Sequence, residues 1–96
     1  VTSGVARKAR PFWGGYAMSK AALESMVLTY AAECEGTKVK ANLINPGAMR
    51  TAMRARAMPG EDPGTLPSPD EIAPLIVELL SPQCEKNGEL ISFRKN

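Results

Sequence analysis

Tyr16 and Lys20, which stand four residues apart, are the two side chains of this sequence best suited to chemistry. Residues four apart on a helix share one face, with Cβ atoms about 6 Å apart. Free tyrosine has a pKa of about 10, and a cation about 4 to 5 Å away supplies about 3 to 4 kcal/mol toward its anionic form. The pair is therefore suited to protonating a developing alkoxide, or to removing the proton of an alcohol.

The same spacing also arises by chance in helices without a catalytic role, so two further features bear on its interpretation. Ser3 stands at the end of an expected strand, where its hydroxyl would polarise the same substrate carbonyl; a serine that only satisfies a turn is the alternative. Asn45-Pro46-Gly47 ends a second expected strand, and Thr51 follows it with another hydroxyl. The glycine lets the backbone approach a flat ligand, although an ordinary capped turn has the same sequence.

The elements expected to position these residues alternate between strand and helix. Such alternation is typical of an α/β fold with a parallel sheet. In chain order the pattern predicts a strand stub at 1–3, a helix at 16–33 closed by Gly36, a strand at 39–45, a short helix near 50–57, a helix from 69 to about 80 and a strand at 89–93.

The helix that ends near residue 80 has the clearest local start signal. Ser68 is expected at its N-cap with Glu71 three residues later, and Pro69 takes the first helical position. Pro74 is expected inside this helix, where it would remove one backbone hydrogen bond and bend the axis.

The stretch before this helix, rich in methionine and proline, is predicted to be a lid rather than a plain connection. Within it, Arg50 and Arg54 indicate either an anion site or a solvated helix face.

The long helix carries two apolar stripes, whereas the surface helix of a monomer usually carries one. The first stripe comprises Tyr16, Leu23, Val27 and Tyr30, and the second comprises Met18, Ala22 and Met26. We therefore expect this helix to be buried on two sides, by its own sheet and by a second helix that a symmetry-related copy would supply.

The composition excludes several classes of function. The chain has 96 residues, 44% of them apolar, and a net charge of +2, which is too small to argue for nucleic acid or an anionic membrane. No apolar run approaches the length of about 20 residues that spans a bilayer. Cys34 and Cys84 form no metal motif, and the chain has no histidine, so no metal site is expected. Reduced cysteines in a cytoplasmic protein are favoured over a disulfide.

Ser3, the run from Tyr16 to Lys20 and the run from Asn45 to Thr51, in this order and spacing, resemble the short-chain dehydrogenase/reductase family. The likeness covers essentially the whole chain, since 68–80 is similar to the family's last large helix and 88–93 to its last strand. It implies the C-terminal half of a Rossmann-like doubly wound parallel sheet, with 1–96 as a single segment of an NAD(P)-binding domain and 49–67 as its substrate lid.

The resemblance also implies an activity, namely hydride transfer between NAD or NADP and a small-molecule carbonyl or alcohol. In the family, the tyrosine is the general acid/base, the lysine lowers the pKa of the tyrosine and holds the nicotinamide ribose, and the serine positions the carbonyl. The catalytic residues implied are Ser3, Tyr16 and Lys20. The residues implied in cofactor binding are Tyr16, Lys20, Pro46, Gly47, Met49 and Thr51. The helix at 16–33 would join a homodimer or homotetramer.

Three features of the family's pattern are missing from this sequence: a glycine-rich turn between a strand and a helix, a residue that selects NAD or NADP, and a further catalytic asparagine. Met49 also stands where the family usually has a β-branched residue, a change that still allows a backbone contact. The alternative hypothesis is therefore a catalytically silent fragment, or a dimerisation module without the dinucleotide-binding half.

Overall fold

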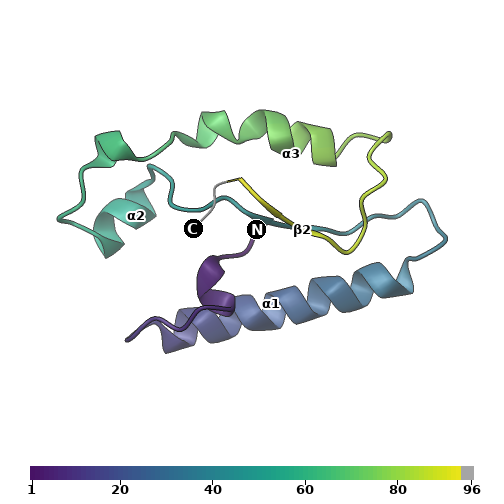
Figure 1. Cartoon of the computed structure of the whole chain (residues 1–96), viewed down its shortest axis with the longest axis horizontal. Coiled ribbons are helices and arrows are strands. Elements are labelled where there is room, and N and C mark those ends of the chain that lie inside the picture. Colours follow the sequence, from purple (N-terminus) through teal and green to yellow (C-terminus); the bar gives the residue numbers. More distant parts are fainter. Residues whose placement is uncertain (94–96) are drawn as a thin grey trace. The chain divides into compact units, whose positions relative to one another are not determined.

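The computed structural model describes residues 1–93 and divides the chain into two units, Val1–Gly47 together with the segment from Glu85 onward, and Ala48–Cys84. The first unit contains a 3-10 helix and three regular elements (Figure 1). These are η1 (Gly4–Ala6), α1 (Gly14–Glu33), β1 (Leu43–Asn45) and β2 (Leu90–Ser92). The second unit contains α2 (Ala52–Ala57), η2 (Pro63–Thr65), η3 (Pro69–Glu71) and α3 (Ala73–Leu79).

The two strands of the first unit pair in parallel, as the α/β pattern predicts, with Leu43 opposite Leu90 and Asn45 opposite Ser92. Backbone groups alternate between the two edges of a strand. The N–H of Leu43 and the C=O of Asn45 bond toward β2, while the C=O of Ile44 accepts from the N–H of Thr2 at 2.8 Å. The N-terminal segment therefore runs along the other edge of β1.

Two strand predictions need correction. Residues 1–3 form no regular strand, because the chain turns into η1 after a single ladder bond. The strand predicted at 39–45 begins only at Leu43, because the N–H of Ala41 donates to the side-chain oxygen of Asn87 at 2.9 Å and not to a main-chain carbonyl. A side chain thus replaces one of the two main-chain partners of Ala41, whose C=O still accepts from the N–H of Gly88 at 2.8 Å.

Helix α1 begins two residues before its predicted start and ends at the predicted Glu33. Gly36 follows it with φ +81°, the left-handed conformation expected of a glycine after a helix C-terminus. Leu23 and Val27 of the first stripe are half-buried, whereas Met18 and Met26 of the second stripe are 71% and 63% exposed. The chain itself therefore partly covers only the middle of the first stripe, since Tyr16 and Tyr30 at its ends are 38% and 50% exposed.

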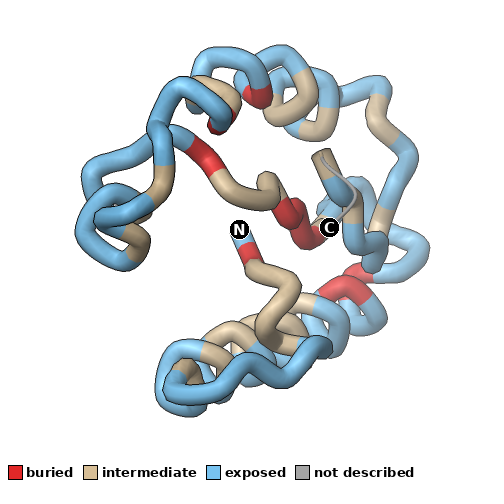
Figure 2. Tube along the Cα trace, turned by 60° about the vertical axis from the view of Figure 1, so that its left-hand side comes forward, coloured by how far each residue is buried: buried red, intermediate tan, exposed pale blue. Residues whose placement is uncertain are grey.

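The buried positions of the first unit lie on β1, at Thr2 beside it and at the C-terminal end of α1 (Figure 2). Leu43 is 2% exposed, and Thr2, beside β1, is 3% exposed. Asn45 is also buried, and its side-chain oxygen accepts from the N–H of Gly47 at 3.1 Å. The core of this unit thus includes the strand end and the N-terminal segment that the candidate chemistry needs.

The helix start predicted at Ser68 is confirmed, but the continuous helix is not. Ser68 accepts from the N–H of Asp70, and Glu71 accepts from the N–H of Ser68 at 2.7 Å, which completes a capping box. The chain then breaks at Ile72 between η3 and α3. Pro74 lies in the first turn of α3, where an N–H would have no acceptor within the helix. The predicted loss of a hydrogen bond at Pro74 is therefore wrong.

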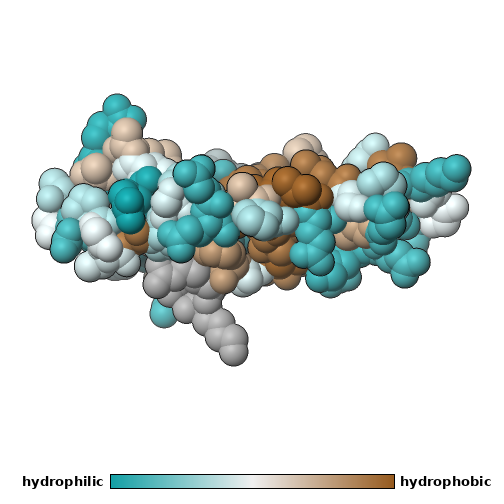
Figure 3. Space-filling view, turned by 90° about the horizontal axis from the view of Figure 1, so that it is seen from above, coloured by the Kyte–Doolittle hydropathy of each residue, from teal (hydrophilic) through white to brown (hydrophobic). Residues whose placement is uncertain are grey.

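Two large apolar side chains are exposed on and after α3. Val77 is 69% exposed and Leu80, which follows the helix, is 79% exposed. Figure 3, which looks down on α3, shows hydrophobic surface over this helix.

Within the described residues, no helix is long and apolar enough to cross a membrane. Cys34 and Cys84 are both free, as favoured from the sequence.

Candidate active site

Tyr16 and Lys20 lie side by side on α1. The lysine Nζ is 5.6 Å from the centroid of the tyrosine ring, which is the adjacency expected from a spacing of one helical turn. Tyr16 is 38% exposed and Lys20 is half-buried, so the phenol faces a position that small molecules can reach. The arrangement places a cation over the tyrosine ring.

Trp13 supports the tyrosine ring from the start of the helix. The two rings meet edge to face, with centroids 6.0 Å apart and planes at 84°. The guanidinium of Arg10 lies 4.4 Å from the centroid of the Trp13 ring on its face. The indole thus packs between a cation and the candidate catalytic phenol, and it orients that phenol.

Ser3 is the N-cap of η1, and its hydroxyl accepts from the N–H of Val5 at 3.4 Å. This bond is the turn function that the sequence allowed as an alternative. The segment that carries Ser3 also lies against α1, because the Nζ of Lys20 donates to the C=O of Val1 at 3.2 Å. The lysine therefore contacts the tyrosine ring and the N-terminal segment together.

Glu24, which the sequence analysis did not single out, joins the same segment to α1. Its carboxylate accepts from the hydroxyl of Thr2 at 2.6 Å and forms an ion pair with Arg7. Burial raises the pKa of Glu24, but the hydrogen bonds from Arg7 and Thr2 outweigh it, and the pKa lies below its usual value. The signal was present in the sequence, because Tyr16, Lys20 and Glu24 repeat every four residues along one helix face.

The carboxyl end of β1 lies next to η1, since a Cβ added to Gly4 would lie 3.9 Å from the side-chain nitrogen of Asn45. Gly47 adopts φ +73°, which a residue with a Cβ rarely adopts, and Pro46 precedes it. Ligands of open parallel sheets bind beyond the carboxyl ends of the strands. The Pro46-Gly47 turn occupies such a position in the first unit.

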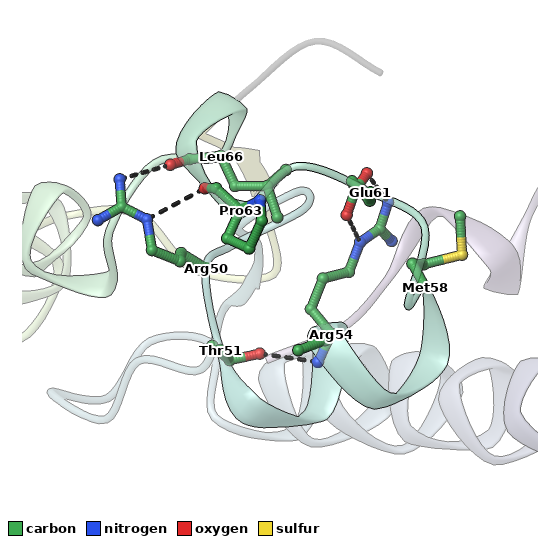
Figure 4. A pocket seen from close by; sticks show the side chains of 8 residues that line it. Arg50, Thr51, Arg54, Met58, Glu61, Pro63 and Leu66 are labelled. Carbon is green, nitrogen blue, oxygen red and sulfur yellow. Dashed lines mark hydrogen bonds and ion pairs between the residues drawn. The ribbon is translucent and has the colours of Figure 1, made fainter.

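Met49 and Thr51 belong to the second unit. The Met49 side chain is buried at 8% exposure, so only its backbone remains for a ligand. The Thr51 hydroxyl accepts from the N–H of Arg54 at 3.1 Å and caps α2 (Figure 4). The hydroxyl predicted to contact the cofactor therefore also has a structural role at the start of this helix.

Both arginines of the predicted lid tie the lid to itself (Figure 4). Arg50 donates to the carbonyl oxygens of Pro63 and Leu66 at 3.1 and 3.0 Å. Arg54 makes two parallel bonds to the carboxylate of Glu61 at 2.8 and 2.9 Å, and these bonds raise the pKa of Arg54. The pocket between them has a volume of about 20 Å³, room for a water molecule. Arg50 is thus exposed yet bonded to its own lid, whereas Arg54 is half-buried and paired with Glu61; the anion site stays a prediction.

Arg54→Ala is expected to loosen the lid, because it leaves the Glu61 carboxylate without its bidentate partner. A pair of this exposure contributes about 1 kcal/mol, so local opening should increase about fivefold. Hydrogen exchange of the amides in 58–66 measures the opening. Arg56→Ala is the matched control, since Arg56 is exposed on the same helix. Equal exchange in both variants would contradict a role for the Arg54–Glu61 pair in closing the lid.

Comparison with known proteins gives a consistent result. Residues 1–62 match the family described as short chain dehydrogenase. The chain is 47% identical over 79 residues to the uncharacterized oxidoreductase YciK of Escherichia coli K12, covering 82% of this chain and 31% of that protein. It superposes with a TM-score of 0.91 and 40% identity on a short chain dehydrogenase from Salmonella enterica serovar Typhi, covering 98% of this chain and 39% of the other.

A third similar protein, a putative short chain dehydrogenase from Escherichia coli CFT073, was solved in complex with NADPH; its TM-score is 0.90 at 41% identity, over 98% of this chain and 39% of that one. The chain thus spans about a third of the length of these relatives. The predicted α/β class is confirmed, because the parallel strands and helices form part of a Rossmann-like fold. On the match of residues 1–62 and the similarity to these proteins, the chain belongs to the short-chain dehydrogenase family.

Proposed function

We propose that these residues supply the proton-transfer side of an oxidoreductase that moves hydride between NAD or NADP and a small-molecule carbonyl or alcohol. The observation that carries the proposal is the Tyr16 phenol with the Lys20 ammonium 5.6 Å from its ring. The similarity to a protein solved with NADPH supports the nicotinamide cofactor. The substrate class follows from the proton chemistry, since a phenol next to a cation serves an alkoxide and its alcohol.

The residues present fit the nicotinamide end of such a cofactor. Pro46 and Gly47 form a turn at the carboxyl end of a parallel strand. Gly47 adopts φ +73° there, and because glycine has no Cβ, a ligand can approach its backbone closely. Lys20 offers an ammonium to ribose hydroxyls, and we assign Met49 a backbone contact and Thr51 a hydroxyl contact. When bound, the cofactor supplies or accepts the hydride.

The chain's own side chains would handle the proton and the carbonyl. Tyr16 donates its phenolic proton to the substrate oxygen as charge develops there, and it takes the proton back in the reverse direction. Lys20 stabilises the phenolate that remains, because its positive charge lies next to the ring. Ser3 donates its hydroxyl hydrogen to the same substrate oxygen, while its oxygen still accepts from the N–H of Val5.

Two further parts of the proposal concern substrate cover and assembly. Residues 49–67 form the substrate lid, held in shape by the Arg50 and Arg54 contacts. Helix α1 joins copies of the protein in a homodimer or homotetramer, which would cover the exposed side chains of Met18 and Met26. The catalytic face and the association face would then lie on one helix.

A turnover assay of the intact protein tests the function. NADPH and NADH oxidation should be followed by absorbance with a panel of aldehydes and ketones, and we expect saturable, carbonyl-dependent oxidation of at least one cofactor. Trp13 fluorescence provides the second readout, because this indole lies against Tyr16 and should respond to cofactor binding. Self-association with neither turnover nor saturable fluorescence change would instead support the catalytically silent dimerisation module.

A further inference from the structure

The side chain of Glu24 stands at the centre of a small polar cluster that the proposed proton chemistry does not use. The side chain is only 13% exposed, although it carries a carboxylate. Thr2, which is 3% exposed, and Arg7 both donate to the same carboxylate oxygen, Oε2. A charged group with so little solvent is stable only when partners of this kind compensate it. The cluster is therefore a built feature of the first unit.

The positions of the two donors explain what the cluster holds. Thr2 directly precedes Ser3, the N-cap of η1, and Arg7 is the C-cap of the same 3-10 helix. The Glu24 carboxylate therefore binds the chain both before and after the Ser3 turn, that is, Ser3 with η1. Between these two donors, η1 is closed by its own backbone, since the amides of Ala6 and Arg7 bond to the carbonyls of Ser3 and Gly4 at 3.2 and 3.1 Å. The turn that carries Ser3 is thus anchored at both ends to one residue of α1.

The same helix face carries the proposed catalytic pair. Tyr16, Lys20 and Glu24 follow one another at intervals of one turn, which places them in a row. Lys20 contacts Val1, and Glu24 contacts the residues on both sides of Ser3. The distance between two groups that share a substrate oxygen depends on such contacts, because a displacement of about 1 Å can cost about a hundredfold in rate.

Resting on the proposed function, we infer that Glu24 is a positioning residue: its carboxylate, held by Thr2 and Arg7, fixes the Ser3 turn against the face of α1 that carries Tyr16 and Lys20. It touches neither substrate nor cofactor and acts through Ser3. Its removal should therefore affect the chemical step more than cofactor binding, and only as long as Ser3 is present.

Glu24→Ala in the intact protein is expected to lower kcat about 10- to 100-fold with little change in the KM for the cofactor. In a Ser3→Ala background the same change should lower kcat less than about twofold, because the group that Glu24 positions is gone. Thr2→Val, which keeps the shape and removes one donor, should cause a smaller loss of about fivefold. Steady-state kinetics of the wild type and the three variants in this cycle, with Thr2→Val beside them, measure these effects.

Two controls separate positioning from general damage. Glu33→Gln alters an exposed carboxylate on the same helix and should leave kcat unchanged. Glu24→Gln keeps an oxygen that accepts from Thr2 and loses the charge opposite Arg7, so its kcat should fall between those of the wild type and Glu24→Ala. If Glu24→Ala does not fold, the cycle is run with Glu24→Gln, and non-additivity with Ser3→Ala is again the expected result.

Hydrogen exchange gives a readout that is independent of turnover. The amides of Ala6, Arg7 and Lys8 should exchange at least about tenfold faster in Glu24→Ala than in Glu33→Gln, since the anchor of η1 is lost. Additive losses of kcat in the double variant, or unchanged exchange of these amides, would overturn the positioning role. Neither result would overturn the proposed function, which Tyr16→Phe tests separately. A wild-type protein without turnover would refute the proposed function, and the exchange result alone would then decide whether Glu24 anchors the turn.

Discussion

Tyr16→Phe is expected to lower kcat about 10²- to 10⁴-fold, the range that general acid/base groups contribute. Phenylalanine keeps the ring that packs edge to face on Trp13 at 6.0 Å, so the variant removes the hydroxyl and little else. The proton donor for the developing alkoxide is then lost together with one hydroxyl next to the cofactor, whereas the other groups proposed to hold the cofactor remain. Cofactor affinity, measured by Trp13 fluorescence, should change less than about threefold.

Tyr30→Phe is the matched control, since it removes a second phenol from the same helix at a residue that is 50% exposed. Its kcat should equal that of the wild type. If Tyr16→Phe retained more than about a tenth of the wild-type kcat, the phenol would not be the acid/base, and the proposed assignment of the site would be wrong.

Lys20→Met has the second largest expected effect. Methionine keeps most of the apolar stem and removes the charge that lies 5.6 Å from the tyrosine ring. At an effective dielectric of about 20, and with allowance for partial exposure, that charge contributes about 2 to 3 kcal/mol to a phenolate, or about 10²-fold in rate. We expect kcat to fall by about that factor and the dissociation constant of the cofactor to rise, because the proposed ribose contact is also lost.

The pH dependence of kcat separates these two roles of Lys20. In the direction of alcohol oxidation, where Tyr16 accepts the proton, the activity of Lys20→Met should recover in part as the pH is raised, because the phenol can then ionise without the cation. Lys38→Met, at an exposed position, serves as the control for loss of charge. A Lys20→Met protein with weaker cofactor binding but an unchanged pH profile would restrict the lysine to cofactor binding.

The elements that could be predicted from the sequence are those with local causes. The long helix at 16–33 and Gly36 after it follow from side-chain period and backbone conformation, and the structure has both. The Ser68 capping box depends on residues three apart, so its pattern is visible in a short stretch of sequence. The juxtaposition of Tyr16 and Lys20 is local in the same sense, because a helix fixes it.

The features that could not be predicted depend on contacts between distant parts of the chain. Asn87 shortens β1 by offering its side chain to Ala41, 46 residues away. The spacing of Tyr16, Lys20 and Glu24 places Glu24 on the candidate catalytic face, but its partners come from residues 22 and 17 positions away, and no local pattern identifies them. Phe12 adopts φ +70°, a conformation that its residue type does not suggest.

The lid illustrates how a local pattern can be ambiguous. Arg50 and Arg54 stand four residues apart, as a solvated helix face or an anion site would require. Their actual partners, including Glu61, lie within a proline-rich stretch without helical or strand period. Only the folded loop shows that these guanidinium groups bind their own lid.

Transfer of an isotopic label tests the central claim most directly. The intact protein should be incubated with a reactive carbonyl from the panel and with NADPH or NADH deuterated at the transferred position of the nicotinamide, and the product alcohol analysed by mass spectrometry. We predict deuterium on the carbinol carbon with the wild type and with Tyr30→Phe, and about 10²- to 10⁴-fold slower labelling with Tyr16→Phe. Unlabelled alcohol, or labelling at equal rates with and without the Tyr16 hydroxyl, would contradict a hydride-transfer enzyme that uses Tyr16 as its acid.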